Sequence, residues 1–426
     1  MKTMRSGDRG AQVAFLQLAL QRAGYDAGAL DGIFGSRTQA AVIAFQRAAR
    51  LTPDGIAGAR TLQALDPYFT GYRTRTVTQG DTFWRLAAQY GITVCALQTA
   101  NPQKDPEQLR VGDTLVLPLS FPVVSGEIPF TYEVLQYTLR GLTARYPFLR
   151  RGQIGASVLG RELAELQFGQ GETRVFYNAA HHANEWITTP VVLKFLEELC
   201  NAYACGSEIY GISAKRIFDH ATVCVVPMVD PDGVDLVTGW FSPDSQEYQS
   251  ARAIAGNYPA VSFPDGWKAN ILGTDLNLNY PANWEQARQI KFAQGFTSPA
   301  PRDFVGTAPL SAPESRAVEQ YSRRQNFDLT LSYHSQGEII YWKYLDYEPQ
   351  NSLEIAKLFS RVSGYSVEET PYASGFAGYK DWFIQTYNRP GYTIEVGRGS
   401  SPLPLSQFDR IYRDNAGILT LASIVV

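Results

Sequence analysis

The stretch RVFYNAAHHANEWITTPVVLKFLEEL, residues Arg174–Leu199, contains a strand, a turn and a helix in direct succession. The run RVFYNAA predicts a buried strand, and the apolar spacing from Trp186 onward predicts an amphipathic helix. HHANE lies in the turn between them. The chain has only four histidines, and two of them, His181 and His182, stand side by side in this turn. Because histidine is scarce in this chain, two adjacent histidines in one turn predict a functional role for that turn.

The same alternation of strand and helix continues through residues 130–426. Strand-like runs are ATVCVVPMV, DLTLSYHS and GYTIEV, and helical runs are APESRAVEQYSRRQ and SLEIAKLFSRVS. Such alternation favours an α/β sheet with helices on both faces. Functional groups of these sheets gather outside the strand ends.

His182 and Glu185 are three residues apart, so both side chains can face one ion from a tight turn. A third ligand has to come from another strand end, and His334 in LSYHSQG is well placed. Two histidines and a glutamate with an open fourth position form a catalytic zinc arrangement. His181, the immediate neighbour, should point elsewhere. Spacing alone leaves a structural alternative open, with a capping glutamate and a core histidine.

Residues 1–70 contain an internal repeat, DGIFGSRTQAAV from Asp31 and DGIAGARTLQAL from Asp54. In each copy a DG turn precedes a helix, which together with an earlier helix predicts a bundle of three short helices. This stretch resembles the peptidoglycan-binding-domain-1 family. A generic helical bundle is the alternative.

Residues 71–119 predict a β-α-α-β order, with Asp81 or Thr82 capping the first helix. The strings QGDT, LQTANP and GDTLVLP resemble a single LysM module, a family that binds N-acetylglucosamine chains. We expect Trp84 to lie in the core of this module rather than to form a sugar platform. Residues 120–129, which contain Pro and Gly, predict a linker.

Bulk composition narrows the function classes. A net charge of −3 without a long basic run argues against nucleic acid as the main partner. No apolar run reaches the roughly 18 residues that a membrane helix needs. No apolar segment of a secretory signal follows the basic N-terminus, which predicts a cytoplasmic or spore-associated protein, with the extracellular wall as the alternative. We expect reduced thiols, with a Cys200–Cys205 bridge as the alternative.

Six strings of residues 125–426 occur in the order of the M14 zinc carboxypeptidase family, which this region resembles. They are AHHANEW, VVPMVDPDGV, GWKANILGTDLNLNYPANW, LSYHSQ, PYASGFAGYKDW and YTIEVG. The resemblance implies one zinc ion on His182, Glu185 and His334. It also implies that Glu395 is the general base that takes a proton from the zinc-bound water. A buried structural role is the alternative for Glu395, but an unpaired charge in an apolar strand is costly.

Three positions depart from the family pattern. The family grips a terminal carboxylate with an Asn-Arg pair, and here the pair is Asn277-Leu278, which lacks the guanidinium fork. Lys268 stands where an arginine polarises the scissile carbonyl. A solvated surface lysine is the alternative. Tyr372 matches the mobile tyrosine of the family if one residue is inserted after it, and Tyr379 is its rival.

A branch of the family, the γ-D-glutamyl–diamino acid endopeptidase I group, is similar in these departures and in its wall-binding modules. The resemblance implies hydrolysis of the bond between γ-D-glutamate and meso-diaminopimelate, or lysine, in peptidoglycan stem peptides. The expected partners are glycan strands and stem peptides. We expect Arg398 to receive a substrate carboxylate, with Lys268 and Lys380 as alternates and an ordinary surface arginine as the other possibility.

Two other functions compete with this prediction. The first is a metallocarboxypeptidase that releases C-terminal residues, against which Leu278 argues. The second is a wall-binding protein whose third domain is a non-catalytic relic, against which the intact His182, Glu185, His334 and Glu395 argue.

Overall fold

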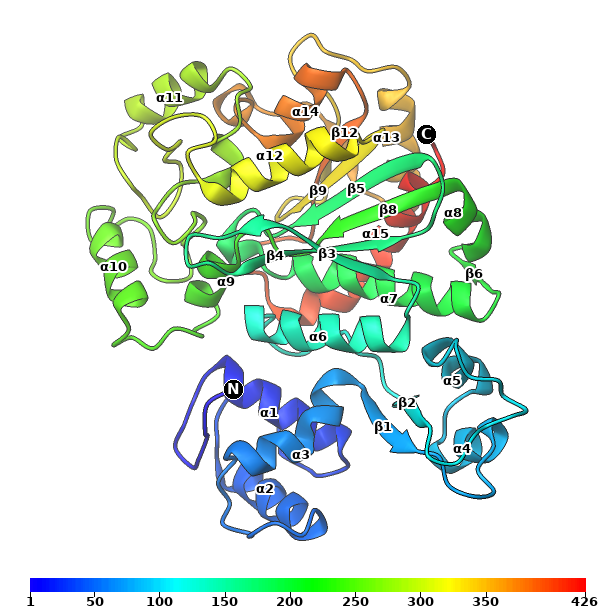
Figure 1. Ribbon diagram of the computed structural model, residues 1–426. Coiled ribbons are helices and arrows are strands. Elements are labelled where there is room, and N and C mark those ends of the chain that lie inside the picture. The colour runs from blue at the N-terminus through cyan, green and yellow to red at the C-terminus, as the bar shows by residue number, and fades with distance from the viewer. The chain divides into compact units, whose positions relative to one another are not determined.

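An eight-stranded mixed sheet, in the order β11-β10-β12-β9-β5-β8-β4-β3, organises the C-terminal part of the chain. Figure 1 shows this sheet in the computed structural model, which describes residues 1–426. Its strands are β3 (Arg150–Ala156), β4 (Glu162–Phe168), β5 (Thr173–Ala179), β8 (Ala221–Val226), β9 (Leu329–His334), β10 (Ile339–Tyr341), β11 (Ser366–Glu368) and β12 (Gly391–Glu395). The α/β architecture expected from the sequence is thereby confirmed.

The four predicted strands, β5, β8, β9 and β12, form the parallel centre of the sheet. β10 pairs antiparallel with β12, and β4 pairs antiparallel with β8. After β5 the chain adds β8 on one side and later β9 on the other, so the order of strands reverses between β5 and β9. Open α/β sheets bind ligands at such a point, outside the carboxyl ends of the strands.

Helices cover both faces of the sheet (Figure 1). They include α7 (Thr188–Ala204), α12 (Pro313–Gln325), α14 (Tyr379–Tyr387) and α15 (Phe408–Ala422). The others of the C-terminal part are α8 (Ala214–His220), α9 (Pro231–Val237), α10 (Gln246–Ala255), α11 (Trp284–Ala293) and α13 (Ser352–Ser363). Two short strands, β6 (Glu208–Ile209) and β7 (Ile212–Ser213), form a separate pair.

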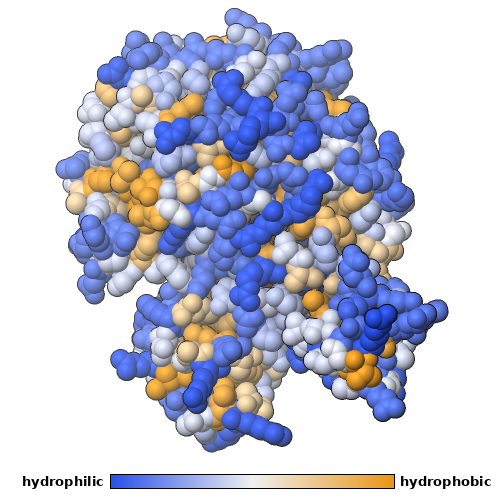
Figure 2. All heavy atoms as spheres, viewed as in Figure 1, coloured by the Kyte–Doolittle hydropathy of each residue, from blue (hydrophilic) through white to orange (hydrophobic).

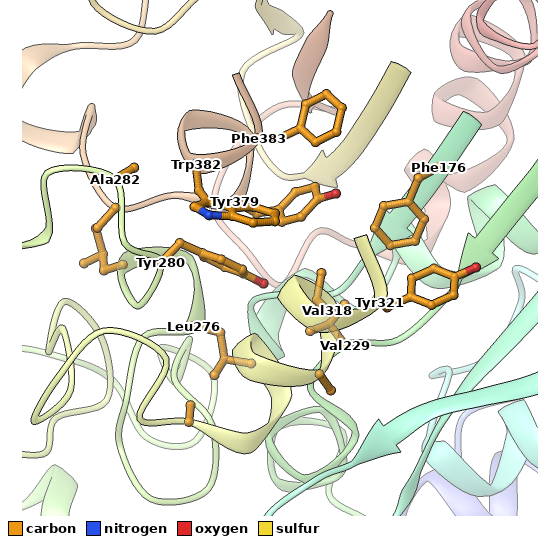
Figure 3. Packing of buried hydrophobic residues seen from close by; sticks show 14 of the residues in the cluster. Phe176, Val229, Leu276, Tyr280, Ala282, Val318, Tyr321, Tyr379, Trp382 and Phe383 are labelled. Atoms are coloured by element: carbon orange, nitrogen blue, oxygen red, sulfur yellow. The ribbon is translucent and has the colours of Figure 1, made fainter. Parts of the chain in front are cut away.

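Successive residues of β5 serve the two opposite faces, as the period of a strand requires. The Phe176 ring packs against Tyr321 of α12 and Tyr379 of α14. Tyr177 packs against Phe195 of α7 and donates a hydrogen bond of 2.7 Å to the Leu419 carbonyl of α15. Figure 3 shows the first of these layers, in which the rings of α12 and α14 lie close to Phe176 and form one aromatic core.

The repeat in residues 1–70 has a structural purpose. Three helices, α1 (Ala11–Arg22), α2 (Ser36–Ala48) and α3 (Ala59–Thr70), form this module. Each DG turn is held by a buried glutamine from the preceding helix, Gln17 or Gln46. Gln46 Nε2 donates to Asp54 and Thr61, and its Oε1 accepts from the Gly55 amide at 3.0 Å. Gln17 makes the same set of bonds to the first turn.

The second module has the predicted β-α-α-β order. It consists of β1 (Tyr72–Thr76), α4 (Phe83–Tyr90), α5 (Val94–Ala100) and β2 (Thr114–Pro118), and β1 pairs antiparallel with β2. The prediction that Trp84 lies in the core is wrong, because this side chain is 77% exposed. Phe83 and Leu86 fill the core from α4, and Trp84 is about 100° around the helix from Phe83. Helix α6 (Tyr132–Arg145) follows β2.

The cysteines correct a second expectation. Cys95 and Cys205 form a disulfide, while Cys200 and Cys224 are buried free thiols. The expectation of reduced thiols is therefore wrong for two of the four, and so is the alternative Cys200–Cys205 bridge. Cys200 lies in α7 and is fully buried, whereas Cys205 follows the end of α7 and pairs with Cys95.

The chain forms two units, Met1–Arg150 with Glu197–Glu208, and Arg151–Leu196 with Ile209–Val426. The boundaries drawn from the sequence at residues 70, 119 and 130 stay a proposal. None of the helices has the length and apolar character needed to span a bilayer. In Figure 2 hydrophilic residues cover most of the visible face, and apolar residues gather only in small clusters.

Candidate active site and metal centre

Three parallel strands bring site residues to one edge of the sheet. His182 follows the end of β5, His334 ends β9, and Glu395 ends β12. β5 is parallel to β9, and β9 is parallel to β12, with His334 and Glu395 directly paired in register. Side chains at paired positions of neighbouring strands leave the sheet on the same face. The three functional groups therefore meet beyond one edge.

The turn after β5 is held by Thr188, near the start of α7. Its hydroxyl accepts a hydrogen bond from the Ala180 amide at 3.0 Å and donates one to the Glu185 carbonyl at 2.7 Å. The intervening residues form a short 3-10 turn, Ala183–Glu185, which presents His182 and Glu185 on the same side. HHANE is thus a turn between a strand and a helix, with His182 and Glu185 on one side, as the sequence predicts.

Three buried side chains converge on one point. His182 Nδ1 lies 3.0 Å from Glu185 Oε1, and His334 Nδ1 lies 2.9 Å from Glu185 Oε2. The two ring nitrogens are 3.2 Å apart. His181 takes no part, because its Nε2 contacts the Tyr280 hydroxyl at 3.0 Å. The predicted ligand set is thus assembled, and His181 points elsewhere as expected.

Asp275 orients the first ligand. Its Oδ1 lies 3.1 Å from His182 Nε2, so the hydrogen of the imidazole is held on Nε2 and the Nδ1 lone pair is free to bind a metal. Burial acts to lower the pKa of His182, but Glu185 and Asp275 outweigh it and raise the pKa to about 9. Burial also lowers the pKa of His334, which favours the neutral form that a ligand needs.

The donor set fits zinc. Two imidazole nitrogens and one carboxylate, all within 4.8 Å of one another, leave one side of the centre open. Catalytic zinc sites use such a set, and a carboxylate behind a ligand histidine is their usual support. His182, Glu185 and His334 are therefore the residues that would hold the ion.

A cavity of about 220 Å³ opens beside this centre, and Glu395 lines it together with His182, Lys268 and Asn277. A second cavity of about 500 Å³ shares Glu395, Lys268, Arg302 and Tyr341 with the first. Burial, and next the negative charge of Glu185, raise the pKa of Glu395 to about 8. A carboxylate with a raised pKa, placed in a cleft beside a metal set, has the properties of a general base.

Lys268 is not a solvated surface residue. Its Nζ lies 2.9 Å from Glu185 Oε1, and the side chain is 19% exposed. Burial acts to lower the pKa of Lys268, but Glu185 and Asp275 outweigh it, so the ammonium stays charged. The backbone holds it in place, since the Lys268 carbonyl accepts from the Ala183 amide of the ligand turn.

Comparison with known families agrees with this geometry. Residues 135–417 match the model of the zinc carboxypeptidase family, Peptidase_M14. The chain belongs to that family. Residues 9–65 match a peptidoglycan-binding domain, and residues 76–118 match LysM.

Two relatives and one solved structure illustrate the likeness. The chain is 42% identical over 300 residues to gamma-D-glutamyl-L-diamino acid endopeptidase 1 of Lysinibacillus sphaericus, covering 70% of this chain and 74% of the relative. It is 37% identical over 317 residues to YqgT of Bacillus subtilis, covering 74% and 80%. Bovine thrombin-activatable fibrinolysis inhibitor shares the fold, with a TM-score of 0.52 at 19% identity over 70% of this chain and 98% of that one.

The zinc carboxypeptidase site of this chain lacks an arginine next to Asn277. Leu278 lines the smaller cavity instead and is 7% exposed. Asn277 also lines it, but its Oδ1 accepts from the Tyr379 amide at 3.0 Å. An apolar side chain thus stands where a carboxylate anchor is expected.

The two candidates for the mobile tyrosine, Tyr372 and Tyr379, differ in burial. Tyr379 is fully buried, and its hydroxyl contacts Ser322 at 2.8 Å, so it cannot swing into the cavity. Tyr372 is 67% exposed on a short 3-10 turn, and its hydroxyl accepts from Gln286 at 3.2 Å. It does not line the cavity that contains Glu395, although Ser374 of the same turn does. Its role as the mobile tyrosine stays a prediction.

Arg398 is not brought to either cavity. Its guanidinium contacts Glu338, with Nε 2.7 Å from Oε2, and the side chain is 72% exposed. The structure instead brings Arg302 to both cavities. Sequence reasoning missed Arg302 because its loop, PAPRDF, carries no motif. It also missed Asp275, although this acid stands only two residues before Asn277.

Proposed function

We propose that the chain is a zinc-dependent endopeptidase that hydrolyses the bond between γ-D-glutamate and a diamino acid in peptidoglycan stem peptides. The observation that carries this proposal is the His182–Glu185–His334 set with Glu395 in a cavity where Leu278 replaces the carboxylate anchor. The 42% identity to an endopeptidase of this specificity supports it.

The chain's own residues supply most of the chemistry. Zinc, when bound, would lower the pKa of a water molecule and polarise the scissile carbonyl. Glu395 accepts the proton of the attacking water and passes it to the leaving amine. Lys268 stabilises the negative charge that develops on the carbonyl oxygen. Asp275 keeps the His182 ring in its ligand orientation.

Arg302 is our candidate for the free α-carboxylate of the γ-D-glutamyl residue. It lines both cavities, as Glu395 and Lys268 do. Its Nε lies 2.6 Å from Asp303, which leaves both terminal nitrogens for a two-pronged contact with a carboxylate. Replacing Arg302 by lysine should therefore weaken cleavage of a γ-linked substrate, because an ammonium cannot reproduce the fork.

The test is digestion of the tripeptide L-Ala-γ-D-Glu-meso-diaminopimelate, analysed by mass spectrometry. The zinc-loaded chain is expected to release L-Ala-γ-D-Glu. The Glu395→Gln variant should bind zinc at the same stoichiometry and lose at least about 100-fold in kcat. Unchanged tripeptide with the wild-type enzyme would contradict the proposal, and undiminished turnover by the variant would remove Glu395 as the base.

A carboxypeptidase of ordinary peptides is the competing function, and a substrate pair separates the two. An enzyme that anchors a terminal carboxylate loses most activity when that carboxylate is amidated. With Leu278 in the anchor position, we expect amidation of the C-terminal carboxylate to change kcat/KM less than about threefold.

The two N-terminal modules support a wall-bound enzyme. Binding to glycan strands and stem peptides would raise the concentration of the catalytic domain near its substrate. The Cys95–Cys205 disulfide is of a kind that persists in oxidising surroundings outside the cytosol. We therefore propose a location at the wall in place of the cytoplasmic one. Retention of the reduced and oxidised chains by isolated sacculi tests the wall binding.

A further inference from the structure

A third cavity, of about 290 Å³, lies in the N-terminal part of the chain, apart from the residues that would bind zinc. The loop after α1, the end of α2, helix α3 and strand β1 form its walls. Three aromatic rings, three alanines and a proline line it, and Arg73 is the one charged side chain among them. The volume is at the lower end of the range for small-molecule sites, so the cavity suits a small group.

The three rings form one aromatic wall. Phe45 meets Tyr25 and Tyr68 edge-on, with ring centroids 5.6 and 6.4 Å apart. Methyl groups of alanines from α2 and α3 continue this wall, which is suited to a small apolar group. No acid or amide side chain lines the cavity, so the hydroxyls of a sugar ring would find few partners there.

Arg73 has no acidic partner in the chain, which distinguishes it from its neighbour on the same strand. Arg75, two residues further along β1, pairs with Asp81 at 3.1 Å. The contacts of Arg73 are instead aromatic, since its guanidinium carbon lies 5.8 Å from the Tyr68 ring centroid and 5.7 Å from that of Tyr90. Contact with rings holds a guanidinium in place and leaves the N–H groups at its edge for a carboxylate.

The terminal nitrogens of Arg73 are available for such a contact. Nη2 lies 3.4 Å from the Tyr68 hydroxyl, which is a long hydrogen bond, and Nη1 has no partner in the chain. Nε is enclosed and contributes nothing to a ligand. An arginine prefers a carboxylate that it can contact with two N–H groups at once. The cavity therefore combines an apolar wall with a fixed cation that lacks a counter-charge.

We propose that this cavity binds the C-terminal end of a short peptide, with the terminal carboxylate on Arg73 and the last small side chain against the rings of Tyr25, Phe45 and Tyr68. Stem peptides that are not cross-linked offer this combination of a methyl group and a free carboxylate. The inference rests on the proposed wall-bound function, and it names the part of the wall that the N-terminal modules bind.

The site is shared by the two N-terminal modules. Helix α3 of the first module runs directly into β1 of the second, so the Tyr68 ring and the Arg73 guanidinium are only five residues apart (Figure 1). Both residues lie between the two stretches that match the family models, 9–65 and 76–118. Neither family pattern includes them, and the complete site requires both modules in one chain.

The experiment measures binding by saturation-transfer NMR to the full zinc-loaded chain with Glu395→Gln, which cleaves no probe. The probes are acetyl-D-alanyl-D-alanine, its C-terminal amide, and a tetrasaccharide of N-acetylglucosamine. The acid should receive saturation on its methyl groups and bind at least about 10-fold more tightly than the amide, the lower range for a hydrogen-bonded charge.

Three further substitutions locate the site. Arg73→Gln should remove the difference between acid and amide. Ala48→Phe, at an exposed position of the cavity wall, should block the cavity and weaken binding of the acid although Arg73 is retained. Arg37→Gln is the matched control, because Arg37 is exposed in the first turn of α2 and does not line the cavity. It should bind all three probes as the parent chain does.

Each outcome decides. Equal binding of acid and amide by the parent chain overturns the role of Arg73 without any variant. Preference for the acid that persists in both Arg73→Gln and Ala48→Phe places the site elsewhere and overturns the inference. Tetrasaccharide binding that Ala48→Phe abolishes would assign the cavity to glycan instead. A chain that isolated sacculi retain but that does not bind the acid overturns the inference and leaves the wall-bound function standing, whereas a chain that sacculi do not retain overturns that function.

Discussion

Replacing Asp275 by asparagine should weaken zinc binding without removing a ligand. Three donors surround the Asp275 carboxylate, namely His182 Nε2 at 3.1 Å and the amides of Asn277 at 3.2 Å and Asp303 at 3.0 Å. An amide has only one acceptor oxygen, so its NH2 group must face at least one of these donors. The negative charge that makes His182 a stronger ligand is lost as well.

The expected loss follows from this geometry. Removal of a carboxylate behind a ligand histidine typically weakens metal affinity by about 10- to 100-fold, or roughly 1.4 to 2.7 kcal/mol. Competition with a chromophoric chelator at fixed pH measures the zinc dissociation constant directly. Circular dichroism of the same sample shows whether the variant is folded.

Asp303→Asn is the control, because this acid lines the same cavity but does not contact His182. Its zinc affinity should stay close to that of wild type, because the Asp303 side chain contacts Lys291 and Arg302 rather than a metal ligand. A folded Asp275→Asn protein with wild-type zinc affinity would refute the assignment of Nδ1 as the ligand atom held in place by this carboxylate.

Three further predictions concern protonation, the N-terminal module and the thiols. At pH 7 the metal-free protein carries protons on Glu395, whose pKa is about 8, and on His182, whose pKa is about 9. A bound dication lowers both pKa values, so zinc binding at pH 7 should release about one proton more from wild type than from Glu395→Gln. Titration with a pH indicator measures this release, and the difference should vanish above pH 9. Equal proton release from the two proteins at pH 7 would contradict the prediction. Gln46→Leu leaves the Gly55 amide without its acceptor and should destabilise the N-terminal module by about 2 to 4 kcal/mol. The loss should be seen as faster hydrogen exchange in α2 and α3. Unchanged exchange would count against the structural role of Gln46 in the repeat. In denaturant without reductant, two thiols should react with Ellman's reagent and four after reduction, whereas four without reduction would exclude the disulfide.

Local sequence pattern was sufficient for the centre of the catalytic domain. β5, β8, β9 and β12 are short apolar runs bounded by turn residues, and α7, α12 and α13 have the helical period. The strands β3, β10 and β11, which lie at or next to the edges of the sheet, were not predicted. β10 and β11 have only three residues each, and β3 has seven residues of mixed polarity, so their strand conformation comes from pairing with neighbours rather than from their own residues.

The zinc ligands were accessible to sequence reasoning because each lies at the end of a recognisable strand, and parallel strands end at a common edge. The exposure of Trp84 and the pairing of the cysteines were not accessible to sequence reasoning. Which face of α4 is buried depends on β1 and β2, and the partner of Cys205 is 110 residues away. Neither relation leaves a local pattern.

The order of residues along this chain thus determined the modules, the α/β class and the identity of the metal-binding side chains, since these depend on local periodicity and motif spacing. Only the tertiary structure decided which charges share the cavity with Glu395. Arg398 contacts Glu338 away from the cavity, whereas Arg302 lines the cavity from a loop without a motif. Lys380, which the sequence offered only as an alternate, also lines it. The physical reason is that the neighbours of a charged side chain are set by contacts between residues far apart in the chain. A short stretch of sequence does not show those contacts.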